Sequence, residues 1–419
     1  MDDSTYHLVT LGCPKNEVDS DKISGLLAHE GMKPTEQVQN ADLIVVNTCA
    51  FVEEARQQSI DTILELADSR QEGARLVVTG CMAERYGNEL SEALPEVDGI
   101  AGFGVPVTLN SRPKTSTEEI PVFDLLNLPR PKAERPWAYV KIAEGCDRSC
   151  GFCAIPTFRG PQRSRSIDSI LNEITELSVR EVVLVAQDLA SFGRDQGKGE
   201  RNIVPLVEQA AQLVDRVRLL YLYPSDLNEE LIDAVLGTGV PYFDLSLQHV
   251  SRPLLRRMRR WGDGERFSQQ IDRIREKNPE AVFRSNFIVG YPGETEEDHE
   301  LLLEFLDKAQ IDWCGFFPYS PEQGTYSETL SDTVDTPIIL ERLSELTEIQ
   351  DRITARNRDN LIGKELEVLV DEVGVGRSWR EAPEIDGIVN ISRELPVGEI
   401  ASVIVSGATG PDLETHATF

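Results

Sequence analysis

The stretch Gly145-Cys146-Asp147-Arg148-Ser149-Cys150-Gly151-Phe152-Cys153 comes almost directly after the apolar run Ala138–Ala143. It places three cysteines on one tight loop in a CxxxCxxC spacing. Thiolates are soft ligands for iron or zinc, and three on a short loop suit an iron–sulfur cluster. Zinc usually takes a fourth Cys or His, and none lies close in the sequence. The loop predicts a four-iron cluster with one iron open to an outside ligand, and a structural metal site is the alternative.

Beyond this loop, residues 137 to about 320 alternate strand-like and helical patterns. Repeated βα units at this spacing predict a partial (βα)6 barrel, whose active site is expected at the C-terminal ends of its strands. The strand-like runs are Ala138–Ala143, Glu181–Ala186, Val217–Leu222, Tyr242–Leu247, Val282–Val289 and Trp313–Pro318, and helical runs include Ile167–Leu177, Ile203–Leu213 and Phe267–Lys277.

The N-terminal part contains three strand-like runs of another pattern. Tyr6–Leu11, Asp42–Val46 and Arg75–Thr79 are apolar without polar alternation, which is typical of strands buried on both faces of a parallel sheet. Their spacing predicts a doubly wound α/β domain. Residues 106–136 then form a linker or a wrapping segment, because they contain Pro106, Pro113, Pro121, Pro129, Pro131 and Pro136.

The C-terminal part begins with a long amphipathic helix. Thr336 is its predicted N-cap, Pro337 its first residue and Gly363 its stop, and Leu340, Leu343, Leu346, Ile349 and Ile353 recur at helical spacing. Glu367–Val370, Gly387–Ile391 and Ile400–Val405 then predict a small antiparallel β-barrel. The expected domains are residues 4–118, 132–362 and 363–419.

A second cysteine set lies in the N-terminal domain. Cys13, Cys49 and Cys81 each come just after a predicted strand, and parallel strand ends share the edge where such sheets bind ligands. Gly12 and Gly80 would let the backbone approach a bound group closely. The placement predicts a second cluster with an open iron, and three buried structural cysteines are the alternative.

Composition restricts the partners. With 42 Lys+Arg against 72 Asp+Glu, the 419 residues carry a formal net charge of −30, which disfavours nucleic acid and anionic membranes and favours a basic partner. No apolar run is long enough to span a bilayer, and the start Met1-Asp2-Asp3-Ser4 lacks the features of a secretory signal. We therefore expect a cytosolic protein whose cysteines serve metal binding or catalysis rather than disulfides.

Both cysteine sets together resemble one family across essentially the whole chain. The sequence is similar to the methylthiotransferases of the radical S-adenosylmethionine superfamily, which join a three-cysteine N-terminal domain, a radical core and a TRAM-type barrel. Within the family it resembles the branch that modifies an aspartate of small-subunit ribosomal protein twelve. The matching segments are Leu11–Asn16, Asn47–Phe51, Cys153–Arg165, Leu247–His249, Val289–Thr295, Gly376–Ser378 and Glu381–Gly387.

The resemblance implies a mechanism that needs cofactors, since replacing an unactivated C–H hydrogen with sulfur lies beyond acid–base catalysis. The cluster on Cys146, Cys150 and Cys153 would reduce S-adenosylmethionine to methionine and a deoxyadenosyl radical, which takes hydrogen from the aspartate β-carbon. The cluster on Cys13, Cys49 and Cys81 would supply sulfur, and a second S-adenosylmethionine the methyl group. An electron donor is also required.

Other residues are candidates for contacting S-adenosylmethionine. They lie at or near predicted strand ends, and the alternative for each is an ordinary loop cap or a core contact. The candidates are Gln187 with Asp188, Gln248 with His249, Ser285 with Asn286, and Gly290 in the turn before a capping box of Thr295 and Asp298. Arg252, Arg256, Arg257, Arg259 and Arg260 form a solvated helix face or contact cofactor or substrate, and Cys314 is expected in the core.

Charge discriminates between the substrates. Residues 361–419 contain four basic residues, Lys364, Arg377, Arg380 and Arg393, against 11 acidic ones, so the barrel carries 4 − 11 = −7. A negative barrel suits a basic ribosomal protein better than RNA, so nucleic acid is not favoured as the direct substrate. Two alternatives stay open: a transfer-RNA adenosine methylthiotransferase with the same cofactors, and a non-enzymatic scaffold whose cysteines hold structural zinc.

Overall fold

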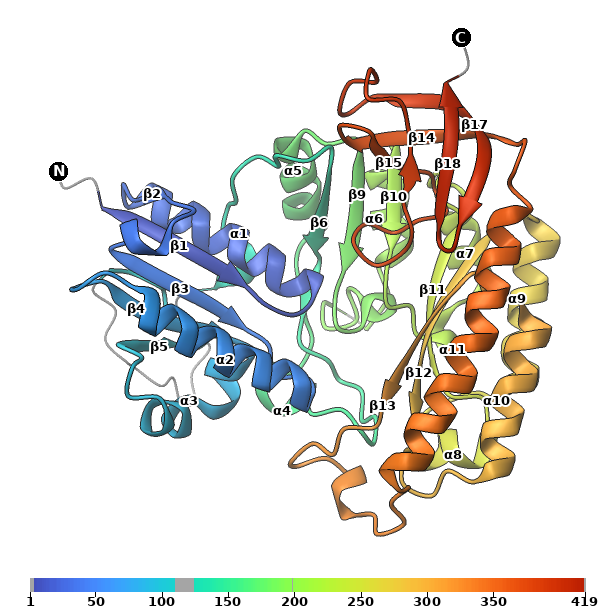
Figure 1. The fold of residues 1–419 in the computed structure, drawn as a ribbon, viewed down its shortest axis with the longest axis horizontal. Coiled ribbons are helices and arrows are strands. Elements are labelled where there is room, and N and C mark those ends of the chain that lie inside the picture. Colours follow the sequence, from blue (N-terminus) through green and yellow to red (C-terminus); the bar gives the residue numbers. More distant parts are fainter. Residues whose placement is uncertain (1–3, 110–123, 198, 418–419) are drawn as a thin grey trace. The chain divides into compact units, whose positions relative to one another are not determined.

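The computed structural model describes residues 4–109, 124–197 and 199–417, so the predicted boundary at residue 118 and two of the linker prolines, Pro113 and Pro121, lie outside the described residues (Figure 1). Contacts divide the chain into two compact units. The first consists of Met1–Lys132, Ala143–Asp147 and Ala154–Arg165, and the second of Ala133–Ile142, Arg148–Cys153 and Ser166–Phe419.

The first unit is built on a five-stranded parallel sheet in the order β2-β1-β3-β4-β5. Its central strands β1 (Thr5–Thr10), β3 (Leu43–Thr48) and β4 (Arg75–Gly80) confirm the three predicted strands to within two residues at each end. The edge strands β2 (Lys33–Pro34) and β5 (Gly99–Ala101) were not predicted, because two or three residues give no recognisable apolar run. This is the predicted doubly wound arrangement.

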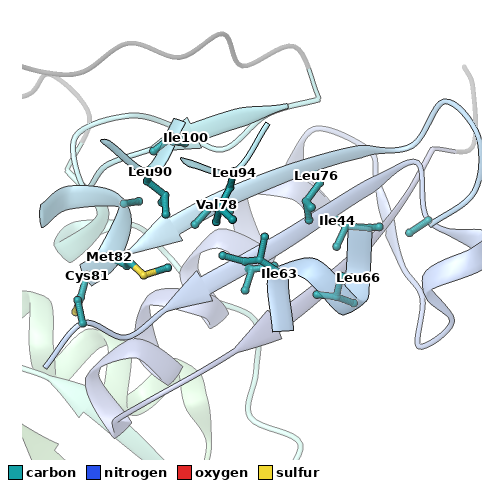
Figure 2. Packing of buried hydrophobic residues seen from close by; sticks show 14 residues of the cluster. Ile44, Ile63, Leu66, Leu76, Val78, Cys81, Met82, Leu90, Leu94 and Ile100 are labelled. Atoms are coloured by element: carbon teal, nitrogen blue, oxygen red, sulfur yellow. The ribbon is translucent and has the colours of Figure 1, made fainter. Parts of the chain in front are cut away.

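Helices cover both faces of this sheet because successive residues of its strands point to opposite sides. On β3, Leu43 and Val45 join a cluster with helix α1 (Pro14–His29). Ile44 and Val46 join the opposite cluster, with α2 (Glu53–Ser69) and α3 (Cys81–Ala93). Figure 2 shows that second cluster, with Cys81 and Met82 at one end of it.

The proline-rich segment wraps around the first unit where it is described. In η2 (Leu125–Asn127), Leu125 joins the cluster of α1, and the carbonyl of Leu126 accepts a 2.5 Å hydrogen bond from buried Lys22 Nζ. The same unit also holds η1 (Val38–Asn40), α4 (Ile155–Arg159) and the antiparallel pair β7 (Ala143–Glu144) and β8 (Arg163–Ser164).

The second unit contains the predicted partial barrel. Two three-stranded parallel sheets are joined by a bridge between Leu222 and Leu245, which gives six strands with β6 and β13 at the two edges. The predicted bounds of the last two strands, Val282–Val289 and Trp313–Pro318, are confirmed to the residue. The third strand, β10, ends three residues earlier than predicted, shortly before Tyr221, which has φ +66°. The strands are β6 (Trp137–Lys141), β9 (Glu181–Val185), β10 (Arg216–Leu219), β11 (Tyr242–Gln248), β12 (Val282–Val289) and β13 (Trp313–Pro318).

The helices of this unit alternate with the strands. They are α5 (Ile167–Leu177), α6 (Ile203–Ala210), α7 (Glu229–Leu236), α8 (Arg252–Arg257), α9 (Gly264–Lys277), α10 (Glu296–Ala309) and α11 (Thr336–Asp359), with the short turns η3 (Leu189–Ser191), η4 (Pro224–Asp226) and η5 (Ser327–Thr329). The capping box of Thr295 and Asp298 is confirmed. Among the described helices, none is both long and apolar enough to cross a membrane.

The predicted ends of α11 were wrong. Its N-cap is Asp335, which is extended, and Thr336 is already helical. The helix ends at Asp359 with Asn360 as C-cap, before Gly363 is reached. Gly363 instead starts the barrel, since its N–H donates to the carbonyl of Val405 at 2.8 Å.

The C-terminal barrel closes in the order β14-β15-β16-β18-β17. All its pairs are antiparallel as predicted, except β16 with β18, which is parallel. Alternate residues such as Val368 and Val370 on β14 and Val403 and Val405 on β17 fill its interior. The strands are β14 (Glu365–Glu372), β15 (Val375–Arg377), β16 (Val389–Asn390), β17 (Ile400–Thr409) and β18 (Asp412–Ala417).

Buried ion pairs hold this barrel to the partial barrel within the second unit. Arg377 pairs with Asp371 at 2.6 Å and with Glu181 of β9 at 3.2 Å. Glu381 pairs with Arg358 of α11 and accepts from Ser378. These residues belong to the segments Gly376–Ser378 and Glu381–Gly387 that mark the ribosomal branch, so the markers have a packing role in this fold.

Candidate metal centres

Cys13, Cys49 and Cys81, the sheet-edge cysteines, all lie at the C-terminal ends of neighbouring strands. Cys13 is the N-cap of α1 after β1, Cys49 follows β3, and Cys81 is the first residue of α3 after β4. The chain leaves β1 toward β2 on one side and later returns to β3 on the other. Ligands of such sheets bind at this switch point, just outside the carboxyl ends of the strands.

Two glycines let these strand ends approach one another closely. Gly12 has φ +95°, and a Cβ there would lie 2.9 Å from Cys49 Sγ. Gly80 has φ +88°, and a Cβ there would lie 2.2 Å from Asn47 Oδ1 and 2.6 Å from the carbonyl of Thr48. Neither position has room for a side chain, so the glycines are required by contact between strand ends as well as by backbone conformation.

A buried hydrogen-bond network fixes the three strand ends. Asn16 Nδ2 donates to the carbonyl of Leu11 at 2.8 Å and to that of Thr48 at 3.0 Å. Asn47 Nδ2 donates to the carbonyl of Asn16 at 2.8 Å, and Thr48 Oγ1 donates to that of Thr79 at 2.5 Å. Asn16 was not predicted as a site residue, although it lies in the segment Leu11–Asn16.

One cation, Arg159, is buried against this set, with a side chain only 1 % exposed. Its Nη2 donates to Cys81 Sγ at 2.9 Å and to Asn16 Oδ1 at 3.0 Å. Its Nη1 donates to Glu144 Oε1 at 2.7 Å, and the guanidinium lies 4.4 Å from the centre of the Phe103 ring. Sequence reasoning missed Arg159, which is separated from Cys81 by 78 positions.

The three thiols differ in acidity. Burial, together with the charges of Cys81 and Cys13, raises the pKa of Cys49 to about 11. Burial also raises the pKa of Cys81, against the charge of Arg159. At Cys13, burial acts in the same direction, but Lys15, Arg159 and backbone amides outweigh it and the pKa is lowered.

Cys146, Cys150 and Cys153, the loop cysteines, lie on a loop with fixed ends. In the first unit, Cys146 N donates to the carbonyl of Gly160 at 3.1 Å. Gly145 has φ +79°, and a Cβ there would lie 2.3 Å from the carbonyl oxygen of Pro161. The segment after α4 therefore packs tightly against the residue that precedes Cys146.

In the second unit, the rest of this loop is held by the barrel. Gly151 N donates to the carbonyl of Met258 at 2.7 Å, and the carbonyl of Gly151 accepts from Ser327 N at 2.8 Å. Arg148 pairs with Asp188 at 2.6 Å and with Asp226, and its guanidinium lies 3.7 Å from the centre of the Tyr223 ring. These contacts orient the two remaining cysteines, both of which are partly exposed.

The arginine cluster after β11 contributes a second contact to sulfur. Arg260 Nη1 donates to Cys150 Sγ at 3.4 Å, and its guanidinium lies 3.9 Å from the centre of the Tyr223 ring. Arg257 pairs with Asp332 at 2.7 Å, and Arg259 stacks on Tyr326 at 4.0 Å. A solvated helix face therefore does not describe Arg260, which contacts a candidate metal ligand.

The candidates for contacting S-adenosylmethionine lie mostly at strand ends. Gln187 lies two residues after the end of β9, and Gln248 is the last residue of β11, with φ +73°. Gly290 follows β12 at φ +83°, and a Cβ there would lie 2.3 Å from Ile339 Cδ1. Ser285 is within β12, fully buried, and donates to the carbonyl of Leu245 at 2.8 Å. Their role as cofactor ligands stays a prediction.

Their neighbours have structural partners. Asp188 is occupied by Arg148 and by Ser191 Oγ, which donates to it at 2.8 Å. His249 is fully buried, burial lowers its pKa to about 4, and its Nδ1 accepts from Ser251 N at 3.0 Å. Cys314 lies on β13, where burial raises its pKa well above the ordinary value.

Comparison with known proteins identifies the family. Residues 5–102 match the uncharacterized protein family UPF0004, residues 140–306 the radical SAM superfamily and residues 362–417 the TRAM domain. The ribosomal protein uS12 methylthiotransferase RimO of Aquifex aeolicus is 42 % identical, covering 98 % of this chain and 96 % of that protein. The chain belongs to the uS12 methylthiotransferase family.

Two further members of this family are similar to this chain over nearly their whole length. The RimO protein of Kineococcus radiotolerans is 39 % identical, with 97 % of this chain and 96 % of that protein covered. The RimO protein of Thermotoga maritima is 39 % identical, with 94 % and 95 % covered. As a uS12 methylthiotransferase family member, the chain is a radical S-adenosylmethionine enzyme that uses S-adenosylmethionine and an iron–sulfur cluster.

The donor chemistry of the two cysteine sets is that of iron–sulfur ligands, which are thiolates. Among the described residues, no three His, Cys, Asp or Glu side chains come close enough together to hold one metal ion. An iron–sulfur cluster has a different requirement, because each of its cysteines binds a separate iron. Both sets supply three thiols, and each has an arginine that donates to a sulfur.

Proposed function

We propose that this enzyme methylthiolates the β-carbon of an aspartate in small-subunit ribosomal protein uS12. The family supplies the reaction class. The observation that carries the proposal is the pair of three-cysteine sets, one at the end of a parallel sheet and one on the loop after β6. A single set would serve ordinary radical chemistry, whereas inserting sulfur needs a second site.

The loop cysteines and the sheet-edge cysteines would each hold a four-iron cluster, so we propose two clusters in all. When bound, the first supplies the electron for cleaving S-adenosylmethionine and the second holds the sulfur for insertion. An electron donor must serve the first. The chain's own part is to set the ligands in place. Asn16 ties the ends of β1 and β3, Thr48 ties the end of β3 to that of β4, and the pairing of Arg148 with Asp188 fixes the loop.

S-adenosylmethionine itself would be bound by Gln187, Gln248, Ser285 and Gly290. Three of the four lie at the carboxyl ends of β9, β11 and β12, which parallel strands present on one edge of a barrel. Gly290 would contribute its backbone, since Ile339 fills the space where a side chain would stand.

The surface of the C-terminal barrel supports a basic protein as the substrate. Of its basic residues, Arg377 is buried in ion pairs and Arg380 pairs with Glu280. In the described part of the barrel, the exposed cations are Lys364 and Arg393, against seven exposed acidic residues, Glu365, Glu367, Glu372, Glu384, Glu394, Glu399 and Glu414. RNA binding needs cations that reach phosphates, so this barrel fits a basic ribosomal protein better.

We propose the domain limits 4–118, 132–362 and 363–419 for these tasks. The matches at 5–102 and 140–306 fall inside the first two limits, and the TRAM match, 362–417, begins one residue before the third. A cytosolic location stays a prediction from the sequence. The domains would divide the work into sulfur supply, radical generation and substrate contact.

The experiment that tests the substrate is a direct competition. Anaerobically reconstituted enzyme is incubated with S-adenosylmethionine, a reductant and either ribosomal protein uS12 or unmodified transfer RNA. We expect a methylthio mass gain on the protein, located to one aspartate by peptide mass spectrometry. A mass gain on transfer RNA alone would contradict the proposal and favour the adenosine-modifying branch.

The metal-binding scaffold is separated from the enzyme by elemental analysis of the protein prepared without oxygen. Iron and acid-labile sulfide in comparable amounts support the clusters. Zinc without labile sulfide would end the radical interpretation of these cysteines.

A further inference from the structure

We propose that Arg159 is a positioning residue of the sheet-edge site, where its guanidinium holds Cys81 and offsets the negative charge of the thiolates that bind a cluster. The inference rests on the proposed second cluster and adds to it the residue that tunes that cluster.

The burial of Arg159 is the first observation. A guanidinium with a 1 % exposed side chain loses its hydration, which costs several kcal/mol unless anionic partners are close. Glu144 is bonded at 2.7 Å and Asp19 lies 3.8 Å away. Both carboxylates are on the Nη1 side, and Nη2 is directed to Cys81 and Asn16. One of the two terminal nitrogens of the guanidinium, Nη2, therefore donates to the cysteine site.

The acceptor on that side is the second observation. A neutral thiol sulfur is a weak acceptor, whereas a thiolate accepts a strong charge-assisted hydrogen bond. The 2.9 Å N–S separation in this buried site places the guanidinium where it would donate such a bond to Cys81 once its thiolate binds iron. Lys15 is a second cation that acts on this set, through Cys13. Three thiolates close together would repel one another, and these two cations lower the electrostatic free energy of holding them in one site.

The origin of Arg159 in the chain is the third observation. It ends α4, six positions after Cys153, and so comes from the same segment as the loop cysteines. Glu144 Oε1 also accepts from Gly145 N at 3.2 Å, directly before Cys146. Within the first unit, a hydrogen-bonded path thus runs from Cys81 through Arg159 and Glu144 to Gly145, the residue before Cys146.

The test uses the full chain with Cys146, Cys150 and Cys153 all changed to Ala, so that any cluster lies on the sheet-edge cysteines. Arg159→Met removes the charge and Arg159→Lys keeps it. The matched control is Arg163→Gln, four residues on, where the side chain is 42 % exposed and pairs with Asp124 at 3.5 Å. Iron and sulfide per chain, iron loss to a chelator and the midpoint potential of the cluster are measured anaerobically.

We expect Arg159→Met to hold iron about 10- to 100-fold more weakly, as loss of an outer-sphere partner typically does. Its midpoint potential should move to a more negative value, because a cation no longer favours the reduced cluster. Arg159→Lys should restore most of both properties, and Arg163→Gln should match the parent. If Arg159→Met does not fold, Arg159→Gln takes its place, since it keeps a donor without the charge.

Two results would overturn the inference. One is a neutral variant with the parent's iron retention and potential. The other is Arg159→Lys that loses as much as the neutral variant, which would show that shape rather than charge matters. If the parent itself binds no iron or sulfide, the proposed second cluster fails, and this outcome is distinct from both.

Discussion

The two cysteine sets are constructed in opposite ways. The loop cysteines lie within eight consecutive residues, are partly exposed at Cys150 and Cys153, and rely on contacts such as Arg148 with Asp188 to hold one loop. The sheet-edge cysteines come from three strand ends more than thirty residues apart. Their geometry depends on Gly12, Gly80 and a network through Asn16.

The difference indicates how each site tolerates change. A site on one loop is assembled locally, and neighbouring side chains can adjust around it. A site at a sheet edge exists only when the whole domain is folded, because three strands must end in register. We therefore expect the sheet-edge site to be the more sensitive to packing and the loop site to be the more sensitive to loss of its own ligands.

The largest expected effect follows from changing Cys146, Cys150 and Cys153 together to Ala. Cleavage of S-adenosylmethionine should fall to background, since no other described loop offers this ligand set. Deoxyadenosine and methionine released under reducing conditions are measured by chromatography. Cys314→Ala, which removes a cysteine outside both sets, is the control and should cleave the cofactor as the wild type does. If the triple variant still cleaved S-adenosylmethionine, the loop cysteines would not be the set responsible for cleavage.

Changing Cys13, Cys49 and Cys81 together to Ala should have a narrower effect. The loop site stays intact, so cofactor cleavage should continue, but the methylthio group should not appear on protein uS12. Peptide mass spectrometry and deoxyadenosine release are followed in the same reaction. Methylthio product at the wild-type level would show that the sheet-edge cysteines are only structural.

Packing at the sheet edge is tested by Gly80→Ala. The new Cβ would overlap Asn47 Oδ1 and the Thr48 backbone, and φ +88° is itself unfavourable, so unfolding free energy should fall by roughly 3 kcal/mol. Gly73→Ala is the matched control, because it has the same φ with nothing within 4 Å and should lose only about 1 kcal/mol. Denaturant unfolding of both apoproteins measures the difference, and equal losses would contradict the packing argument.

The equivalent change at the loop, Gly151→Ala, should have the smallest effect. Its Cβ would lie 2.9 Å from Tyr291 Oη and 3.2 Å from Tyr326 Cδ1, which are side-chain atoms, and the nearest backbone atom, the carbonyl oxygen of Arg257, would lie 3.3 Å away. A loss of about 1 kcal/mol is expected, with iron binding retained. A loss as large as that of Gly80→Ala, measured in the same way, would show that the loop is as rigidly packed as the sheet edge.

Much of this architecture could be predicted from local patterns. The apolar runs of β3 and β12 and the strand-end positions of Cys13, Cys49 and Cys81 are local features of the sequence. Arg159 was missed because its contact with Cys81 joins residues 78 positions apart and follows no period. Arg260 could not be distinguished by sequence from the neighbouring arginines, although it donates to Cys150. The start of α11 depended on whether Thr336 or Asp335 was extended, which residue preferences alone do not decide.

The central claim is that each cysteine set holds its own cluster, and iron counting after anaerobic reconstitution tests it most directly. Wild-type chain and the two triple Ala variants are compared, with labile sulfide measured alongside. Two four-iron clusters predict that each triple variant keeps about half of the wild-type iron and sulfide. The account would be contradicted if the variant lacking Cys13, Cys49 and Cys81 kept all of its iron, or if either variant lost all of it.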